Sequence, residues 1–112
     1  MVNNFAQGDI IYIDFNPQAG HEQMERRPAV VISNDVYNSL SNLLMLCPIT
    51  NTVKNHPFHI NLDSRTKTTG AVLCDQAKML DVSARNARFE EKLPIDLLEE
   101  IVDIVYSFIE II

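Results

Sequence analysis

Apolar and polar positions alternate over several short stretches of the chain, which predicts β-strands. The stretch 10–15 is rich in β-branched and aromatic residues, and 29–32 is apolar on both faces, as in a central strand covered on both sides. Pro48 lies near the end of a third apolar run and predicts an edge or a bulge there, because proline has no N–H for the ladder. The strands expected from these patterns are 10–15, 29–32, 43–49, 58–62, 70–80 and a short 83–89.

The last part of the chain has the period of an amphipathic helix. Pro94 suits its first turn, because the N–H there has no helical partner. Polar residues recur along one face and apolar residues lie opposite. The polar face consists of Asp96, Glu99, Glu100, Asp103, Ser107 and Glu110. With a short helix at 35–40, this pattern predicts an α+β fold, mainly β: a small β-barrel or twisted antiparallel sheet with a C-terminal α-helix.

The composition is that of one globular domain over residues 1–112. Hydrophobic residues make up 46% and charged residues 21% of the chain, which is enough to build a core. No apolar run approaches the roughly 20 residues that span a bilayer, and the first residues lack the basic and apolar regions of a secretory signal. The cysteines, Cys47 and Cys74, are too few for a disulfide framework. A cytoplasmic protein is expected.

The net charge of −6 argues at first against a nucleic-acid partner. Its distribution along the chain weakens that argument. Residues 89–112 hold seven acids and a single base, Lys92, whereas residues 26–88 hold eight bases and four acids. The acidic excess is therefore expected on the solvated face of the C-terminal helix, and the middle of the chain can still present a basic groove.

Residues 16–27 form a polar loop that is long for a compact domain and is therefore a candidate functional loop. It brings carboxylates, an imidazole and two guanidiniums together, which are the groups that phosphodiester cleavage requires: a base for the attacking oxygen and a cation for the developing charge. Arginine suits the second role because its planar fork matches phosphate oxygens. The alternative is a set of exposed, weakly paired loop charges. The candidates are His21, Glu22, Gln23, Arg26 and Arg27.

Two further clusters carry weaker signals. Thr50 and Asn51 follow the third strand, where a hydroxyl either donates to a phosphate or bonds its own backbone in a turn. Asp75 and Gln76 lie within the predicted strand 70–80 and are expected on opposite faces, so that one of them is buried or points into a cleft. Gln76 could then contact the edge of a base.

Metal and cofactor sites are not expected. His56 and His59 are three apart on a loop and a strand, which does not fit a helical pair of ligands four residues apart. The sequence also holds no glycine-rich nucleotide-binding motif and no nucleophile elbow.

The order and spacing of these clusters resemble the MazF/PemK/Kid family of toxin–antitoxin ribonucleases, over nearly the whole chain. The residues that carry the resemblance are Gly8–Phe15, Gly20–Gln23, Arg27–Ser33, Pro48–Thr50, Pro57–Phe58, Asp75–Lys78 and Arg85. The resemblance implies an SH3-like barrel with a C-terminal helix, a homodimer and a cognate antitoxin. It also implies metal-independent cleavage of single-stranded RNA by the ribose 2′-OH, which leaves a 2′,3′-cyclic phosphate and a 5′-OH.

The same resemblance implies roles for individual residues. Arg27 matches the catalytic arginine, Thr50 the threonine at the scissile phosphate, and Glu22 a glutamate proposed as general base. His21 stands where many relatives carry a small polar residue, so the base is either Glu22 or His21. Asp75 is a further catalytic candidate, as in the Kid branch. The expected RNA-binding residues are Gln76, Arg26, Gln23, Asn51 and Lys78. Residues 51–56 and 63–69 match no fixed pattern, so no cleavage sequence is implied.

Two other classes of protein fit the same fold. A CcdB-like toxin poisons gyrase by binding, without catalysis, and a base–cation pair has no use in such a protein. An SH3-like interaction module would have no activity at all. A homodimer has separate support, because the helix carries more apolar surface than one small barrel covers. The residues concerned are Ile104, Ile109, Ile111 and Ile112.

Overall fold

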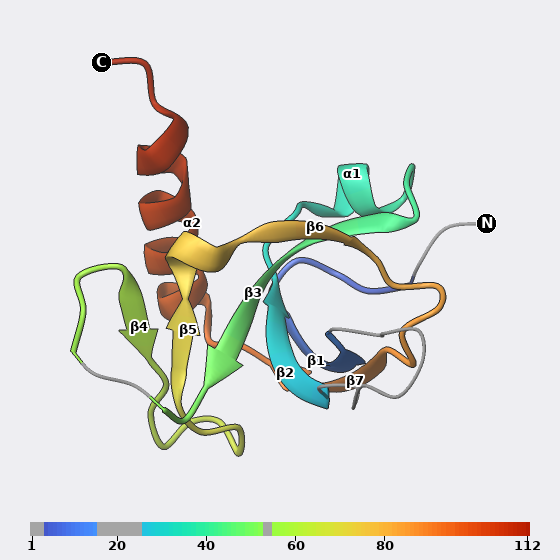
Figure 1. Ribbon diagram of the computed structural model, residues 1–112, viewed down its shortest axis with the longest axis horizontal. Coiled ribbons are helices and arrows are strands. Elements are labelled where there is room, and N and C mark those ends of the chain that lie inside the picture. The colour runs from blue at the N-terminus through green and yellow to red at the C-terminus, as the bar shows by residue number, and fades with distance from the viewer. Residues whose placement is uncertain (1–3, 16–25, 53–54) are drawn as a thin grey trace, which may run out of the picture.

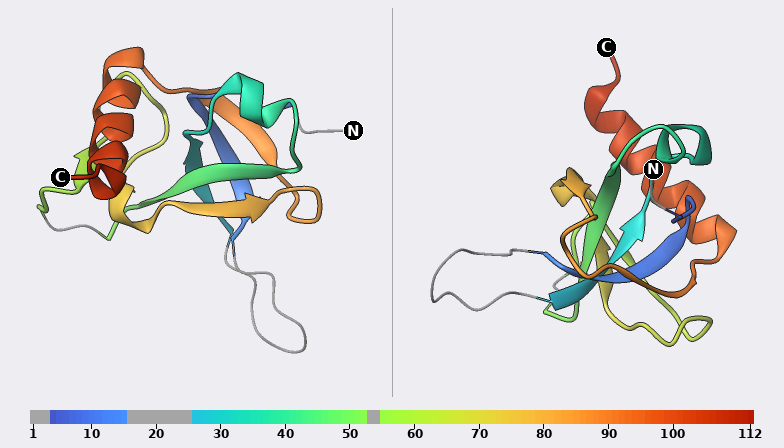
Figure 2. Two further views of the ribbon diagram at one scale, coloured as in Figure 1. Left: turned by 90° about the horizontal axis from the view of Figure 1, so that it is seen from above. Right: turned by 90° about the vertical axis from the view of Figure 1, so that its right-hand side faces the viewer.

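The computed structural model describes residues 4–15, 26–52 and 55–112, and its strands form one antiparallel sheet with a long helix against it (Figure 1). The elements in chain order are β1 (Asp9–Asp14), β2 (Arg26–Val31), α1 (Asp35–Asn38), β3 (Leu43–Thr50), β4 (His59–Asn61), β5 (Ala71–Leu73), the 3₁₀ turn η1 (Cys74–Gln76), β6 (Lys78–Asp81), β7 (Arg88–Lys92) and α2 (Ile95–Ile109). Figure 2 shows α2 beside the end of the sheet that carries β4 and β5.

The strands are ordered β4-β5-β3-β2-β1-β7, and β6 also pairs with β3. β3 therefore pairs with two strands along the same side: its first residues pair with β6 and its last two with β5. Within the described residues no pairing joins β4 to β7, so the sheet is open. The predicted fold class is confirmed, in its form of an antiparallel sheet with a C-terminal helix.

Side chains that alternate along the strands build a core on each face of the sheet. One core lies under α2 and joins Ile10 and Val30 to Leu98 and Ile101 of the helix. The other lies on the opposite face and includes Ile11, Ile13, Ala29, Val31 and Leu46. The apolar run in β2 is thus buried on both faces, as predicted for a central strand.

The structure corrects three predictions made from the pattern. The expected strand 70–80 is two strands separated by η1. Pro48 lies in a central strand and not at an edge. On the side of β3 away from β2, Leu46 is the last residue paired with β6 and Ile49 is the first paired with β5. Pro48 falls in the gap between these two pairings, so no strand there needs its N–H. β2 begins at Arg26, so both arginines of the expected loop 16–27 belong to a strand.

Helix α2 has the predicted faces. The acidic positions are exposed, and Leu97, Leu98 and Ile101 are buried against the sheet. Pro94 occupies the N-cap, one residue before the expected first turn. Within the described residues no helix is long and apolar enough to cross a membrane.

Candidate functional site

Arg27 and Thr50 come together because β2 and β3 pair in a fixed register. Ala29 lies opposite Pro48 and Val31 opposite Leu46. Continuing this antiparallel register by two residues places Arg27 opposite Thr50, with both side chains on the same face of the sheet. Both residues are partly buried. The register thus brings toward each other two residues that are expected to contact a phosphate and are far apart in the sequence.

Phe15 forms an aromatic platform beside this pair. Its side chain is 5% exposed, with the Arg27 Cζ atom 6.0 Å and the Lys78 Nζ atom 5.0 Å from the ring centroid. Cations within about 6 Å of a ring centroid are attracted by the ring. Phe15 thus lies beside two positive charges, from β2 and β6, on one face of the sheet. We refer to Arg27, Thr50, Lys78 and Phe15 as the phosphate edge.

Residues 16–25 connect Phe15 to Arg26 along the chain. Three predicted site residues, His21, Glu22 and Gln23, lie in that segment and are outside the described residues. The choice between Glu22 and His21 as general base therefore stays open.

Arg26 lies on the opposite face of β2 from Arg27 and pairs within the protein. Its Nη1 donates to Asp14 Oδ1 at 2.9 Å and its Nη2 to the Asn86 carbonyl at 2.9 Å, while its Cζ lies 5.2 Å from the centroid of the Tyr12 ring. The hydrogen bonds from Arg26 and from Asn86 Nδ2 hold the pKa of Asp14 below its usual value. Arg26 therefore ties the start of β2 to β1, which places its neighbour Arg27.

A tight backbone contact fixes the turn that follows Thr50. Gly70 has φ of +113°, and a Cβ there would overlap the Thr50 carbonyl. The Thr50 hydroxyl accepts from the Thr52 N–H at 3.1 Å, as in the predicted turn, and this leaves its own hydrogen to donate to a ligand. Asn51 Oδ1 accepts from the Thr69 hydroxyl at 2.9 Å.

Asp75 and Gln76 lie in η1 and are both exposed. The expectation that a strand would turn one of them into a cleft is wrong, because the strand is interrupted at this point. Asp75 instead approaches β4, with its Oδ1 3.7 Å from His59 Nε2. Gln76 is exposed and lies two residues before Lys78 in the chain.

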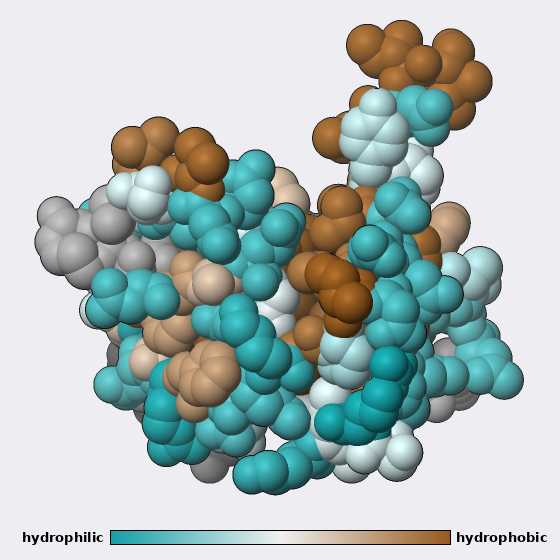
Figure 3. Space-filling view, turned by 180° about the vertical axis from the view of Figure 1, so that it is seen from behind, coloured by the Kyte–Doolittle hydropathy of each residue, from teal (hydrophilic) through white to brown (hydrophobic). Residues whose placement is uncertain are grey.

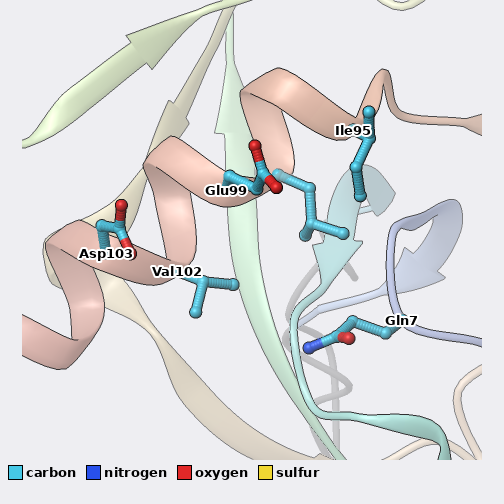
Figure 4. A pocket seen from close by; sticks show the side chains of 6 residues that line it. Gln7, Ile95, Glu99, Val102 and Asp103 are labelled. Carbon is cyan, nitrogen blue, oxygen red and sulfur yellow. The ribbon is translucent and has the colours of Figure 1, made fainter.

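Two hollows elsewhere do not include Arg27. One, of about 460 Å³, is lined by Tyr12, Asn51, residues 67–69 and Arg88 among others, on the face of β1 that carries Tyr12. The other, of about 370 Å³, lies between α2 and Gln7 (Figure 4). Because Glu99 and Asp103 line the second hollow, its charge does not suit an anionic ligand.

Sequence reasoning missed the roles of Phe15 and Gly70. Phe15 was expected only as one more apolar residue of its strand, and nothing in the pattern shows that two cations flank its ring. For Gly70 a signal was present, because a glycine that opens a strand often marks a bend or a close backbone approach.

The protein is thus a small antiparallel sheet with a C-terminal helix, and it carries an arginine and a threonine that suit a phosphate. Known proteins share this combination. A family model described as PemK-like, MazF-like toxin of type II toxin-antitoxin system matches residues 6–109. The chain belongs to this family.

Individual relatives agree with this assignment. The endoribonuclease toxin MazF of Escherichia coli (strain K12) is 39% identical over 89 residues, which cover 78% of this chain and 79% of the relative. The endoribonuclease PemK of Escherichia coli is 30% identical over 103 residues, covering 88% and 77%. A crystal structure of MazE-MazF from Deinococcus radiodurans matches with a TM-score of 0.85 and 36% identity, over 93% of this chain and 94% of the other.

Proposed function

We propose that this protein is the toxin of a type II toxin–antitoxin pair and an endoribonuclease that cleaves single-stranded RNA at specific sequences without a metal ion. The observation that carries the proposal is the pair of cations at the Phe15 ring, Arg27 and Lys78. The β2–β3 register, continued by two residues, adds Thr50 opposite Arg27. Relatives that align with most of the chain are named endoribonucleases, which supports the same reaction here.

The proposed reaction is an internal transesterification. A base, Glu22 or His21, takes the proton from the ribose 2′-OH; the O2′–P bond forms and the P–O5′ bond breaks. The departing O5′ takes up a proton, so the products carry a 2′,3′-cyclic phosphate and a 5′-OH. No cofactor enters this balance.

Arg27 would neutralise the charge that grows on the phosphorus oxygens, and the Thr50 hydroxyl would donate to the same phosphate. Fixed donors of this kind act most strongly where charge develops in the transition state. Lys78 adds a second cation at the edge, and Gln76, Asn51 and Asp75 lie on segments that border it. Asp75 is retained as a second catalytic candidate.

The apolar end of α2 supports the proposed homodimer. Figure 3 shows hydrophobic side chains gathered there, and Tyr106, Phe108 and Ile109 are 60%, 43% and 73% exposed. The apolar surface continues into a groove between α2 and the sheet, lined by Ile32, Met45 and Val105 among others. A second copy of the chain would remove this surface from water.

A cognate antitoxin is proposed as the other protein partner. The Deinococcus radiodurans relatives include MazE-MazF crystal structures, and a mycobacterial endoribonuclease that shares the fold at 15% identity was solved in complex with its cognate antitoxin. An acidic, partly disordered antitoxin segment would suit the two cations of the phosphate edge. We propose that both proteins act in the cytoplasm, where messenger RNA is present.

The test is cleavage of a single-stranded RNA library by the purified protein in excess EDTA, with sequencing of the 5′ ends. We expect short, defined cleavage sites and fragments with 5′-OH and cyclic phosphate ends. Arg27→Ala should slow cleavage by about a hundredfold or more. Thr50→Val should slow it by about tenfold to a hundredfold, since it removes a donor to a charged group.

Arg88→Ala is the matched control, because Arg88 is an exposed arginine of β7 that does not belong to the phosphate edge. It should cleave at the wild-type rate. Intact RNA with wild-type protein, or equal rates for Arg27→Ala and wild type, would overturn the proposal. Growth arrest with intact RNA and trapped DNA breaks would indicate the CcdB-like mechanism instead.

A further inference from the structure

Three side chains that could bind a metal ion meet between β4 and η1. His59 lies in β4, His56 lies three residues before it, and Asp75 lies in η1. One potential ligand atom from each lies within 4.8 Å of the other two. The pairing of β4 with β5 produces this cluster: His59 lies opposite Leu73, and Asp75 follows two residues later. Sequence spacing alone led to the prediction of no metal site, because it could not show that Asp75 joins the two histidines.

The geometry between His59 and Asp75 fits two ligands of one cation better than a hydrogen bond. His59 Nε2 and Asp75 Oδ1 are 3.7 Å apart, which is too long for an N–H···O bond. Two ligand atoms about 2.0–2.1 Å from a tetrahedral Zn²⁺ lie about 3.3 Å apart, so a small movement of the exposed Asp75 side chain would suffice. The other ring nitrogen, Nδ1, is buried and has no hydrogen-bond partner among the described residues. Hydrogen bonding therefore does not account for the position of this ring.

His56 completes the set. Its ring stacks on that of His59 with centroids 4.7 Å apart and an interplanar angle of 29°. Its Nδ1 accepts from the exposed Phe58 N–H at 3.1 Å. Ligation through either ring nitrogen would replace this hydrogen bond, because binding at Nε2 moves the ring proton to Nδ1. The Phe58 amide thus reports directly on cation binding.

The geometry points to a binding site for a zinc-type divalent cation, formed by His56, His59 and Asp75 with the remaining position open to water. Two imidazoles and one carboxylate are a nitrogen and oxygen set that suits Zn²⁺. Cys74, next to Asp75, is not a ligand: it is buried in the core under α2, and burial raises the pKa of its thiol to about 11. Asp75 is also the second catalytic candidate for the proposed RNA cleavage, so cation binding is tested on the protein without RNA.

Binding of Zn²⁺ to the full-length protein, purified without a histidine tag, tests the site by calorimetry with ZnCl₂ alone. We expect one equivalent per chain. His56→Gln, His59→Gln and Asp75→Asn should each weaken binding by about tenfold or more, as loss of a ligand does. His21→Gln is the matched control, since His21 is the one remaining histidine, and it should bind as wild type does.

Two spectroscopic measurements identify the ligands. Co²⁺ in place of Zn²⁺ should give visible d–d bands without the charge-transfer absorption of a thiolate, and Zn²⁺ should shift the amide resonance of Phe58. Circular dichroism of each variant establishes that it is folded, and His56→Gln, at an exposed position, provides the decisive case if another variant unfolds. No stoichiometric binding, a thiolate band, or loss of binding in His21→Gln but not in His56→Gln would overturn the proposal.

Discussion

Gly70 allows the link between backbone geometry and the phosphate edge to be tested with a single methyl group. Gly70→Ala places a Cβ at φ of +113°, against the carbonyl of Thr50 and 3.0 Å from Asn51 Oδ1. The strained backbone should cost about 1–3 kcal/mol. The overlap also endangers the hydrogen bond from the Leu62 N–H to the Gly70 carbonyl, 2.9 Å long, which is worth about 1 kcal/mol. We expect a total loss of about 2–4 kcal/mol.

Gly8→Ala is the matched control. Gly8 also has positive φ, +92°, but a Cβ there would meet only the Leu98 Cδ2 atom, at 3.1 Å. A side-chain methyl can move by a few tenths of an ångström, so the cost should be about 1–2 kcal/mol from the backbone alone. Gly8 precedes β1, at the opposite end of that strand from Phe15.

Urea unfolding should give the two free energies, and cleavage of one RNA oligonucleotide well below both melting temperatures should give the rates. With about 4 °C per kcal/mol for a domain of this size, Gly70→Ala should melt about 8–16 °C below wild type. It should also cleave more slowly, since Thr50 is displaced, whereas Gly8→Ala should cleave at the wild-type rate. Unchanged stability of Gly70→Ala, or an equal loss of cleavage in both variants, would refute the reasoning.

Three further predictions concern stability and reactivity. Arg65 hydrogen-bonds to Asp63 and lowers the pKa of that carboxyl to about 2. The resulting stabilisation is present above pH 4 and is lost as the pH falls toward 2. In urea titrations at low salt, wild type should therefore lose more stability between pH 4 and pH 2 than Asp63→Asn. Burial raises the pKa of the thiols of Cys47 and Cys74, so Ellman's reagent at pH 8 should react with two thiols per chain in guanidinium and only slowly in the native protein. Ile101→Ala removes a fully buried contact between α2 and the sheet, and denaturant unfolding should show a loss of about 2–5 kcal/mol.

Strands and helices were predictable from the sequence where apolar residues mark the buried positions along the whole element. β1 supplies Ile10 to one core and Ile11 and Ile13 to the other, and α2 turns one apolar face to the sheet. These apolar positions are all visible in the sequence. The start of β2 was not predictable in this way, because Arg-Arg-Pro is a poor strand sequence. Pairing outweighs that preference: Arg26 lies opposite Asp14 in the ladder and forms an ion pair with it.

The break at η1 was unpredictable for a different reason. The stretch 70–80 is compatible with one strand at every position, but β3 takes two partners in succession, β5 and then β6. The chain must therefore turn at Cys74–Gln76 to move from one pairing to the other. Which residues meet depends on this turn, so the approach of Asp75 to His59 was also hidden from the sequence.

The acidic net charge does not oppose an anionic ligand at the phosphate edge, because sheet and helix separate the charges by face. The acids of α2 are exposed, and Asp96 among them is paired with Arg65. Arg27 belongs to the strand face opposite the core that α2 covers, since it alternates with Ala29 and Val31. A helix packs about 10 Å from a sheet, which already equals the distance over which 0.1 M salt screens exposed charges. The charge of Lys78 would therefore act on a phosphate at Arg27, and the charges of the helix would be screened. RNA affinity would depend on a few specific contacts to an unstacked single strand, and non-specific attraction of phosphates would contribute little.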